Sequence, residues 1–427
     1  MPEEDPNARV SPPGSYARYF RPKYAWAAVG ALATIGGFFA FLALFGLTLP
    51  FTSGTSDAEL ITQLEQKVDR LPEYLADLDE TQKETLKAAY EEGRRLQLEG
   101  YQAQDEEKHV EAIDRFARAL ALAETDAQQA ALYILRGNSY LSVSNFPSAQ
   151  DDYVAAIVLA DRLSDPDEAN EARAAALGDL GIVFMKQGDL KRAEEHYQAA
   201  LAIHREIGNR LGEAAGLGNL GLVYEQQGDL DRAEEHHQAS LTVDREIGNR
   251  LGEAYSLGNL GIVFTQQGDL DRAEEYHQAA LAIHREIGSR LGEASVLGNL
   301  GLVYAEQGDL GRAEEHHKSS LTIDREIGNR LGEALDLHNL GNVYYRQGDL
   351  ERAEEQYHAA LAIDREIGHR LGEADTLGNL GFVAANRDER AEACRLLKEA
   401  AAIYADIGAG GEDPDMVRAK LEELGCE

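Results

Sequence analysis

The chain has 427 residues and a formal net charge of −35, because 76 Asp and Glu stand against only 41 Lys and Arg. This balance argues against nucleic acid as a partner, since phosphates would be repelled, and against attraction to anionic lipid surfaces. Two cysteines, Cys394 and Cys426, are too few for a disulfide framework. We expect two free thiols; the alternative is one bond that pins the C-terminal end.

The N-terminal part predicts a membrane anchor. Residues 1–23 are polar, contain prolines and show no periodicity, which is typical of a disordered segment. Residues 24–48 hold an apolar run long enough to span a bilayer. Basic residues precede this run and are scarce after it, so the positive-inside rule places the N-terminus in the cytoplasm. We therefore expect an uncleaved transmembrane signal anchor of a single-pass cell-membrane protein, with the following domain on the non-cytoplasmic side; the alternative is a cleaved signal peptide.

A polar segment and two irregular hairpins are predicted next. In residues 49–80, apolar residues at helical spacing are interrupted by Pro72, which predicts a stalk or N-terminal cap helix. The two divergent helical hairpins that follow carry glycine and aromatic residues at matching places. These residues are Gly100 with Phe116, and Gly137 with Tyr153.

From residue 170 to 408 the sequence repeats with a fixed period of 40 residues, and this period predicts a solenoid. Each repeat contains two helical patterns separated by a pair such as Gly228-Asp229. The glycine can end one helix in the left-handed conformation, and the aspartate can cap the next helix. Each repeat is therefore expected to be a helical hairpin.

The hairpin motif resembles the tetratricopeptide repeat (TPR) family. Leu220-Gly221-x2-Tyr224, then Ala233-x3-His237 and Ser240, occupy the family's characteristic positions. The 40-residue length is similar to that of kinesin light chain and of Pins-type G-protein-signalling modulators. With the membrane segment, we predict an all-α fold: one transmembrane helix, a right-handed TPR superhelix of about eight hairpins at residues 81–409, and a C-terminal capping helix and tail at residues 410–427.

The resemblance implies that the first helix of each hairpin lines a concave, partner-binding groove. One face of these helices carries a recurring amide or acid: Asn219, Asn259, Asn299, Asn339 and Asn379, with Asp179 in the third repeat. A carboxamide can pair with the main chain of an extended peptide, and similar repeat proteins use an asparagine ladder in this way. The alternatives are bonds to neighbouring helices or simple survival from recent duplication. Apolar groove pockets are expected from Ile182, Met185, Leu222, Tyr255, Ile262, Leu302, Leu335, Tyr345 and Phe382.

Several motifs resemble catalytic or metal-binding sites, but their sequence context argues against these functions. Residues 216–221 match G-x-G-x-x-G, but they lie inside a predicted helix rather than after a strand. His196, His236 and His316 lack the spacing of metal ligands. The sequence thus predicts no catalytic residue, metal site or cofactor, and a binding protein rather than an enzyme.

These observations favour a membrane-anchored TPR scaffold or adaptor that binds an extended peptide segment of a protein partner in its groove. The alternative is a self-assembling structural membrane protein, a homo-oligomeric spacer without a separate ligand.

Overall fold

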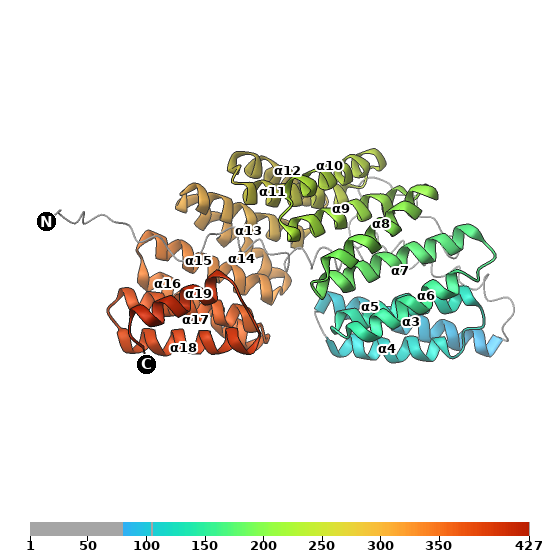
Figure 1. Cartoon of the computed structure of the whole chain (residues 1–427), viewed down its shortest axis with the longest axis horizontal. Helices are drawn as coiled ribbons and strands as arrows, with labels where there is room; N and C mark the ends of the chain where they lie inside the picture. The colour runs from blue at the N-terminus through green and yellow to red at the C-terminus, as the bar shows by residue number, and fades with distance from the viewer. Residues whose placement is uncertain (1–79, 104–105, 427) are drawn as a thin grey trace. The chain divides into compact units, whose positions relative to one another are not determined.

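The computed structural model describes residues 80–103 and 106–426, and every regular element in these ranges is an α-helix (Figure 1). The all-α repeat of hairpins predicted from the sequence is confirmed. The described residues fall into two compact units. Their boundary lies within α11 (Arg250–Gln267), so that the first unit ends at Val263 and the second begins at Phe264.

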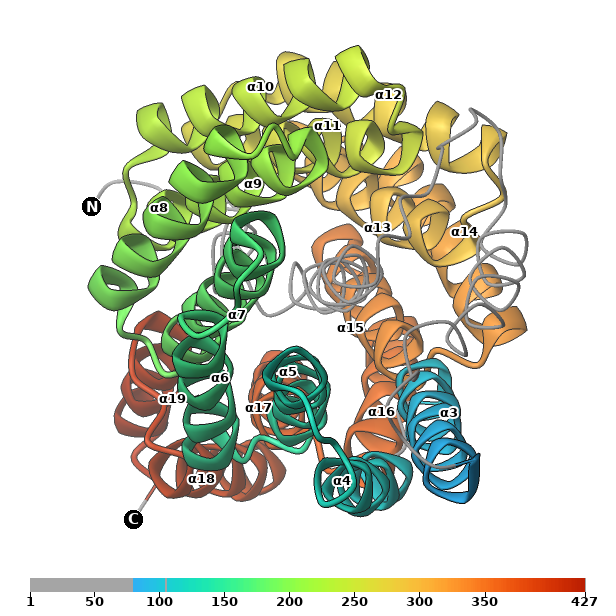
Figure 2. The same ribbon diagram turned by 90° about the vertical axis from the view of Figure 1, so that its right-hand side faces the viewer.

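The helices of each unit follow one another as short antiparallel pairs (Figure 2). Before α11, the first unit contains α3 (Glu80–Ala103), α4 (Glu106–Leu120), α5 (Asp126–Ser142), α6 (Phe146–Ala160), α7 (Pro166–Lys186), α8 (Leu190–Glu206), α9 (Arg210–Gln227) and α10 (Leu230–Ile247). After α11, the second contains α12 (Leu270–Glu286), α13 (Arg290–Gln307), α14 (Leu310–Ile327), α15 (Arg330–Gln347), α16 (Leu350–Glu366), α17 (Arg370–Asn386), α18 (Arg390–Asp406) and α19 (Glu412–Glu423). Within each unit, the second helix of a hairpin also packs on the first helix of the next.

Glycine and aspartate form the turn inside the hairpins. Gly228 follows α9 with a φ of 78°, a left-handed conformation that glycine adopts without steric cost. The side chain of Asp229 then accepts a hydrogen bond of 3.2 Å from the backbone N–H of Arg232. This bond satisfies one of the free amides at the start of α10. The turn therefore forms as predicted, and the same pair recurs in later hairpins.

A glycine on each first helix lets the two helices of a hairpin approach closely. A Cβ at Gly221 of α9 would lie 2.5 Å from Cε1 of His237 on α10, which is too short for van der Waals contact. In the first hairpin the corresponding glycine is Gly93, which packs on the ring of Phe116. The prediction of Gly100 for this place is wrong, because the divergent hairpins do not share the 40-residue spacing that fixes the register elsewhere.

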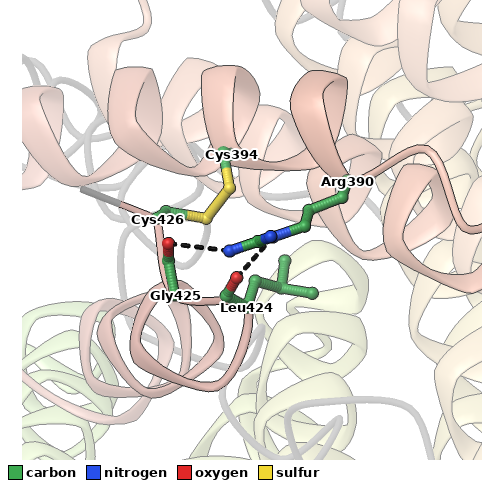
Figure 3. The surroundings of a disulfide bond; sticks show 5 residues. All are labelled: Arg390, Cys394, Leu424, Gly425 and Cys426. Atoms are coloured by element: carbon green, nitrogen blue, oxygen red, sulfur yellow. Dashed lines mark hydrogen bonds between the residues drawn. A yellow bond between two sulfur atoms is a disulfide. The ribbon is translucent and has the colours of Figure 1, made fainter.

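The C-terminal helix α19 covers the last hairpin. Val417 is only 2% exposed, and it packs where a Cβ would stand on Gly378 of α17, 3.2 Å from its Cγ2. Arg390 at the start of α18 donates hydrogen bonds of 2.6 and 2.9 Å to the carbonyl oxygens of Leu424 and Gly425 (Figure 3). Side chain and backbone contacts thus both hold this helix in place.

Cys394 and Cys426 form a disulfide, with their Cα atoms 5.5 Å apart (Figure 3). The expectation of two free thiols is therefore wrong, and the alternative of one bond at the C-terminal end is correct. The physical reason is that α19 runs back along the last hairpin and brings residue 426 beside the first turns of α18.

The prediction of a single-pass membrane protein with a transmembrane helix is corrected by the structure. Among the helices of residues 80–426, none is both long enough and apolar enough to cross a membrane. These helices carry charged residues along one face, as helices packed in hairpins do. The predicted anchor at residues 24–48, the segment 1–23 before it, and residues 49–79 of the stalk lie outside the described residues.

Candidate functional site

All of the predicted groove residues lie on the first helices of hairpins, α7, α9, α11, α13, α15 and α17. Their spacings of three and four residues place them on neighbouring turns of one helical face. Nine of them are half-buried: Asn219, Tyr255, Asn259, Ile262, Asn299, Leu335, Tyr345, Asn379 and Phe382. These nine residues supply the accessible part of the predicted face.

The other predicted groove residues are buried. Ile182, Met185, Leu222 and Leu302 are between 2% and 5% exposed, and the first three belong to the main hydrophobic cluster of the first unit. They pack inside the solenoid because the adjacent first helices cover them. They therefore contribute to the core and offer no open apolar pocket.

We call Asp179 and the recurring asparagines at positions 219, 259, 299, 339 and 379 the ladder. Three of its asparagines have carboxamides without a hydrogen-bond partner among the described residues. Asn219 and Asn259 in the first unit, and Asn299 in the second, are half-buried. Their side chains make no hydrogen bond to another residue within residues 80–103 and 106–426. Asparagine is a mediocre helix former. A carboxamide in the middle of a helix that makes no hydrogen bond within the protein therefore contributes little to the stability of the fold.

The last two asparagines of the ladder differ from these three. Asn339 is 7% exposed, and its Oδ1 is buried without a donor. In contrast, Nδ2 of Asn379 donates a hydrogen bond of 3.1 Å to Oδ1 of Asn342, and it lies 3.2 Å from Nε2 of His338. The alternative considered for the ladder, a bond to a neighbouring helix, therefore applies to Asn379.

Asp179, at the start of the ladder, is a buried acid. It is 4% exposed, and its Oδ2 has no hydrogen-bond partner among the described residues. Burial raises its pKa well above the usual value, because the surroundings disfavour the charged form. The neutral carboxylic acid offers one donor and one acceptor, which resembles the capacity of the carboxamides that follow it.

Ion pairs at the start of α9, α11, α13, α15 and α17 join each of these helices to the second helix before it. Glu213 of α9 is buried, accepts a hydrogen bond of 2.9 Å from Nε of Arg205 on α8, and is also paired with Arg210. Burial alone would raise the pKa of Glu213, but the hydrogen bond from Arg205 and the charge of Arg210 hold it below its usual value. In the second unit, Glu293 makes the corresponding pairs with Arg285 and Arg290, at 2.8 and 2.7 Å.

The sequence did not single out His338 and Thr376 as functional residues, although a signal existed. His338 stands where the other repeats have Gly178, Gly218, Gly258, Gly298 and Gly378. In the structure, its Nδ1 lies 2.9 Å from Oγ1 of Thr376, and its pKa is lowered to about 3 by burial, with a smaller effect from His369. The available signal was a bulky polar residue at a position where the other repeats have glycine.

The described residues contain no cluster of three or more His, Cys, Asp or Glu that could hold a metal ion. His196, His236 and His316 on the second helices contact aromatic rings. His196 stacks on Phe184 with ring centroids 5.1 Å apart, and His236 contacts Tyr224 at 4.8 Å. His316 makes the same contact with Tyr304, whereas Tyr276 and Gln356 stand at this place in the other two regular repeats.

Comparisons with known proteins bear on the same helices. A family model described as tetratricopeptide repeat matches residues 172–246, 248–326 and 333–406, which is more than half of the chain. A second model with that description matches residues 134–206. No curated protein sequence matches the chain.

Several solved structures share the fold. The apo form of the quorum sensor NprR from B. thuringiensis matches with a TM-score of 0.61 and 13% identity, over 80% of this chain and 93% of that one. A Rap protein complexed with competence and sporulation factor matches with a TM-score of 0.56 and 17% identity, over 85% and 92%. Aspartyl phosphate phosphatase F from Bacillus subtilis matches with a TM-score of 0.56 and 13% identity, over 90% and 96%. At these identities the likeness concerns the fold alone.

Proposed function

The chain belongs to the tetratricopeptide repeat family, and on this premise we propose that it is a scaffold that binds an extended segment of a protein partner. The observation that carries the proposal is the half-buried carboxamides of Asn219 and Asn259 in the first unit and of Asn299 in the second, which have no hydrogen bond within the described residues. Each can accept one hydrogen bond and donate two. An extended main chain offers the matching carbonyl oxygens and N–H groups at regular intervals.

Half-buried apolar residues beside these carboxamides would contact the partner's side chains. Tyr255 and Ile262 flank Asn259 in the first unit, and Leu335, Tyr345 and Phe382 supply such surface in the second. These positions differ from repeat to repeat, whereas the asparagines recur. Main-chain bonds to the asparagines would therefore contribute affinity, and the variable side chains would select the partner.

Two of the matched structures support a role in binding. The matched Rap protein is complexed with competence and sporulation factor, and the matched NprR is a quorum sensor. TPR proteins and neighbours of this kind are generally binding or regulatory proteins. We assign the same general role to this chain.

The test is affinity capture from the source cell with the full chain as bait. A second bait carries Asn219→Ala and Asn259→Ala, and a matched control bait carries Gln238→Ala, an exposed residue on the second helix α10. Circular dichroism must first show equal helix content in the three baits. We expect one protein to be retained by the parent and the control and to be lost with the double variant.

Equal capture by all three baits would reject the role of the first-unit carboxamides. Size measurement of the parent across a range of concentrations separates partner binding from self-association, since a scaffold for another protein needs no second copy. A parent that is oligomeric at every concentration and retains no other protein would favour the spacer over the scaffold.

A further inference from the structure

The second unit contains a hydrogen-bonded cluster that joins two neighbouring first helices. Nδ2 of Asn379 on α17 donates to Oδ1 of Asn342 on α15 at 3.1 Å, and the hydroxyl of Tyr357 donates to the same oxygen at 2.6 Å. His338 adds two contacts, 3.2 Å from Asn379 Nδ2 and 2.9 Å from Thr376 Oγ1. The donors of Asn379 are thus directed at its own chain.

One assignment of protons is consistent with all of these contacts. Burial keeps the His338 ring neutral, because it lowers the pKa to about 3. Its Nδ1–H then donates to the hydroxyl oxygen of Thr376, and its bare Nε2 accepts from the Asn379 carboxamide. Thr376 is fully buried and His338 is 4% exposed, so water does not compete with these bonds.

The preceding step of the ladder lacks this cluster. The residues that correspond to His338 and Asn342 one repeat earlier are Gly298 and Leu302, which have no polar side-chain atom. Asn339 therefore finds no side-chain partner there, and its Oδ1 has no donor in the part of the chain that the structure describes. Two substitutions between neighbouring repeats thus decide whether the next asparagine is bonded internally.

We propose that the cluster of His338, Asn342, Thr376 and Asn379 closes the ladder at its C-terminal end, so that a partner's main chain is bound by Asn299 in the second unit and not by Asn379. This inference rests on the proposed function, because it names the place where peptide binding stops. Asn379 is a structural residue that ties α15 to α17. A partner segment that extends past Asn339 reaches a carboxamide whose N–H donors are already directed at Asn342 and His338.

The closed end has a chemical consequence for the partner. A ligand carbonyl at this place would have to break the bond from Nδ2 of Asn379 to Asn342, or its contact with His338, before it could accept a hydrogen bond from that amide. Because one hydrogen bond is exchanged for another, the ligand gains little affinity there. Recognition at α17 then relies mainly on side-chain contact with residues such as Phe382, which is half-buried.

The test uses the full chain and a phage-displayed library of random short peptides. The library is selected on the Asn219→Ala/Asn259→Ala variant, so that carboxamides of the first unit do not contribute. The tightest peptide is synthesised, and its affinity is measured by fluorescence anisotropy with Asn299→Ala and with Asn379→Ala added to the same background. A copy of the peptide with N-methylated backbone amides tests whether the protein binds the peptide through hydrogen bonds to its main-chain N–H groups.

We expect Asn299→Ala to weaken binding about fivefold and Asn379→Ala to change it less than about twofold. Asn379→Ala should instead lower the midpoint of thermal unfolding by about 3 °C, since buried groups lose a partner. Equal weakening by both variants, without a shift of the unfolding midpoint for Asn379→Ala, would overturn the closed end. No loss with Asn299→Ala, or no loss on N-methylation, would instead reject the proposed function itself.

A triple variant provides a second, independent measurement. His338→Gly, Asn342→Leu and Tyr357→His copy the residues of the preceding repeat, which has Gly298, Leu302 and His317 at these places. In this background Asn379 is released, and we expect Asn379→Ala to weaken binding about fivefold. If the triple variant folds and Asn379→Ala still has no effect, the cluster is not what excludes Asn379. If the triple variant does not fold, the comparison of Asn299→Ala with Asn379→Ala still tests the proposal.

Discussion

The hydroxyl of Tyr357 donates a hydrogen bond of 2.6 Å to Oδ1 of Asn342 inside the hairpin α15–α16. Tyr153 makes the same bond, also 2.6 Å long, to Asn138 in the hairpin α5–α6. In both hairpins the asparagine directly follows the glycine on which the tyrosine ring packs. The repeat thus accepts a buried tyrosine where its first helix supplies a matching amide.

Tyr197 breaks this pairing and leads to the first prediction. It packs on Gly181, but the next residue is Ile182, and the buried Tyr197 hydroxyl has no partner in residues 80–103 and 106–426. We expect Tyr197→Phe to stabilise the protein by about 1 kcal/mol, because an unsatisfied group is removed, and Tyr357→Phe to destabilise it by about 1 kcal/mol. Thermal unfolding followed by circular dichroism measures both. Shifts of the same sign would show that the pairing does not control stability.

The second prediction concerns the histidines that replace tyrosine in three other hairpins. His237 and His277 are fully buried, and both ring nitrogens of each lack a partner among the described residues. Burial lowers the pKa of each to about 3, with a small further effect of His236 on His237. In the unfolded chain a histidine titrates near 6.5. Between pH 6.5 and about 3 the unfolded chain therefore binds a proton that the folded protein excludes, so the free energy of unfolding is highest above pH 6.5 and falls as the pH is lowered towards 3.

We therefore expect His237→Phe to raise the unfolding midpoint at pH 7 and to flatten the loss of stability in acid. The difference between variant and parent should grow by about 1 kcal/mol per pH unit below pH 6. Urea unfolding at a series of pH values measures it. Tyr197→Phe is the matched control, because it changes a ring at the same helix position and no group that titrates in this range. A difference that stays constant with pH would contradict the role given to His237.

The third prediction concerns two buried acids in the second unit. Asp336 on α15 is 3% exposed, its Oδ2 has no partner among the described residues, and its Oδ1 lies 3.4 Å from Nδ1 of His317. Burial raises the pKa of Asp336 well above its usual value. It also raises the pKa of Asp324 on α14 to about 7, with a further contribution from the charge of Asp336. Burial keeps His317 neutral, with a pKa of about 3, so its contact with Asp336 is not an ion pair at pH 7.

When the pKa of an acid is higher in the folded than in the unfolded state, its contribution to stability is complete below the unfolded pKa, near 4. This contribution is lost as the pH rises through the pKa of the folded state. Asp336→Val places at this position the residue of the preceding repeat, Val296. We expect the variant to gain about 1 to 3 kcal/mol over the parent at pH 8 and distinctly less at pH 5. Thr376→Val, at the same helix position in α17, is a control without an acid and should show no such pH dependence. A gain that is equal at both pH values would argue against ionisation of Asp336.

The regular part of the fold was predictable because local chemistry and the repeat agree there. Gly228 and Asp229 mark a turn in the sequence, and each performs the expected role. Gly93 was missed because the first hairpin is outside the 40-residue register. The free thiols were wrongly expected because the sequence predicted a capping helix but not the tertiary packing that brings residue 426 beside α18.

The candidate site was predictable only in its positions. The spacing of Asn219, Asn259 and Asn299 placed all three on first helices, as the structure has them. Spacing could not distinguish Asn379 from them, because its bonds depend on His338 and Asn342 one repeat earlier. Nor could it reveal that Met185 is buried, since solvent exposure on a first helix depends on the adjacent hairpin.

The last prediction concerns the disulfide between Cys394 and Cys426, which closes a loop with a sequence separation of 32. A crosslink of this span stabilises by about 3 to 4 kcal/mol in the chain-entropy model. We expect Cys394→Ser/Cys426→Ser to lose protection from hydrogen exchange in α19 first, because Arg390 and Val417 then hold it alone. Exchange in α13 to α15 should be unchanged.

Hydrogen exchange measured by mass spectrometry with and without a dithiol reductant tests this point directly. Reduction of the parent should reproduce the double serine variant, and the variant itself should not respond to the reductant. If α19 keeps its protection in both, the packing of Val417 and the bonds from Arg390 suffice to hold the helix, and the disulfide adds no stability to this end of the chain. If protection is lost equally from α13 to α19, the second unit unfolds as one cooperative body and the effect is not local to the cap.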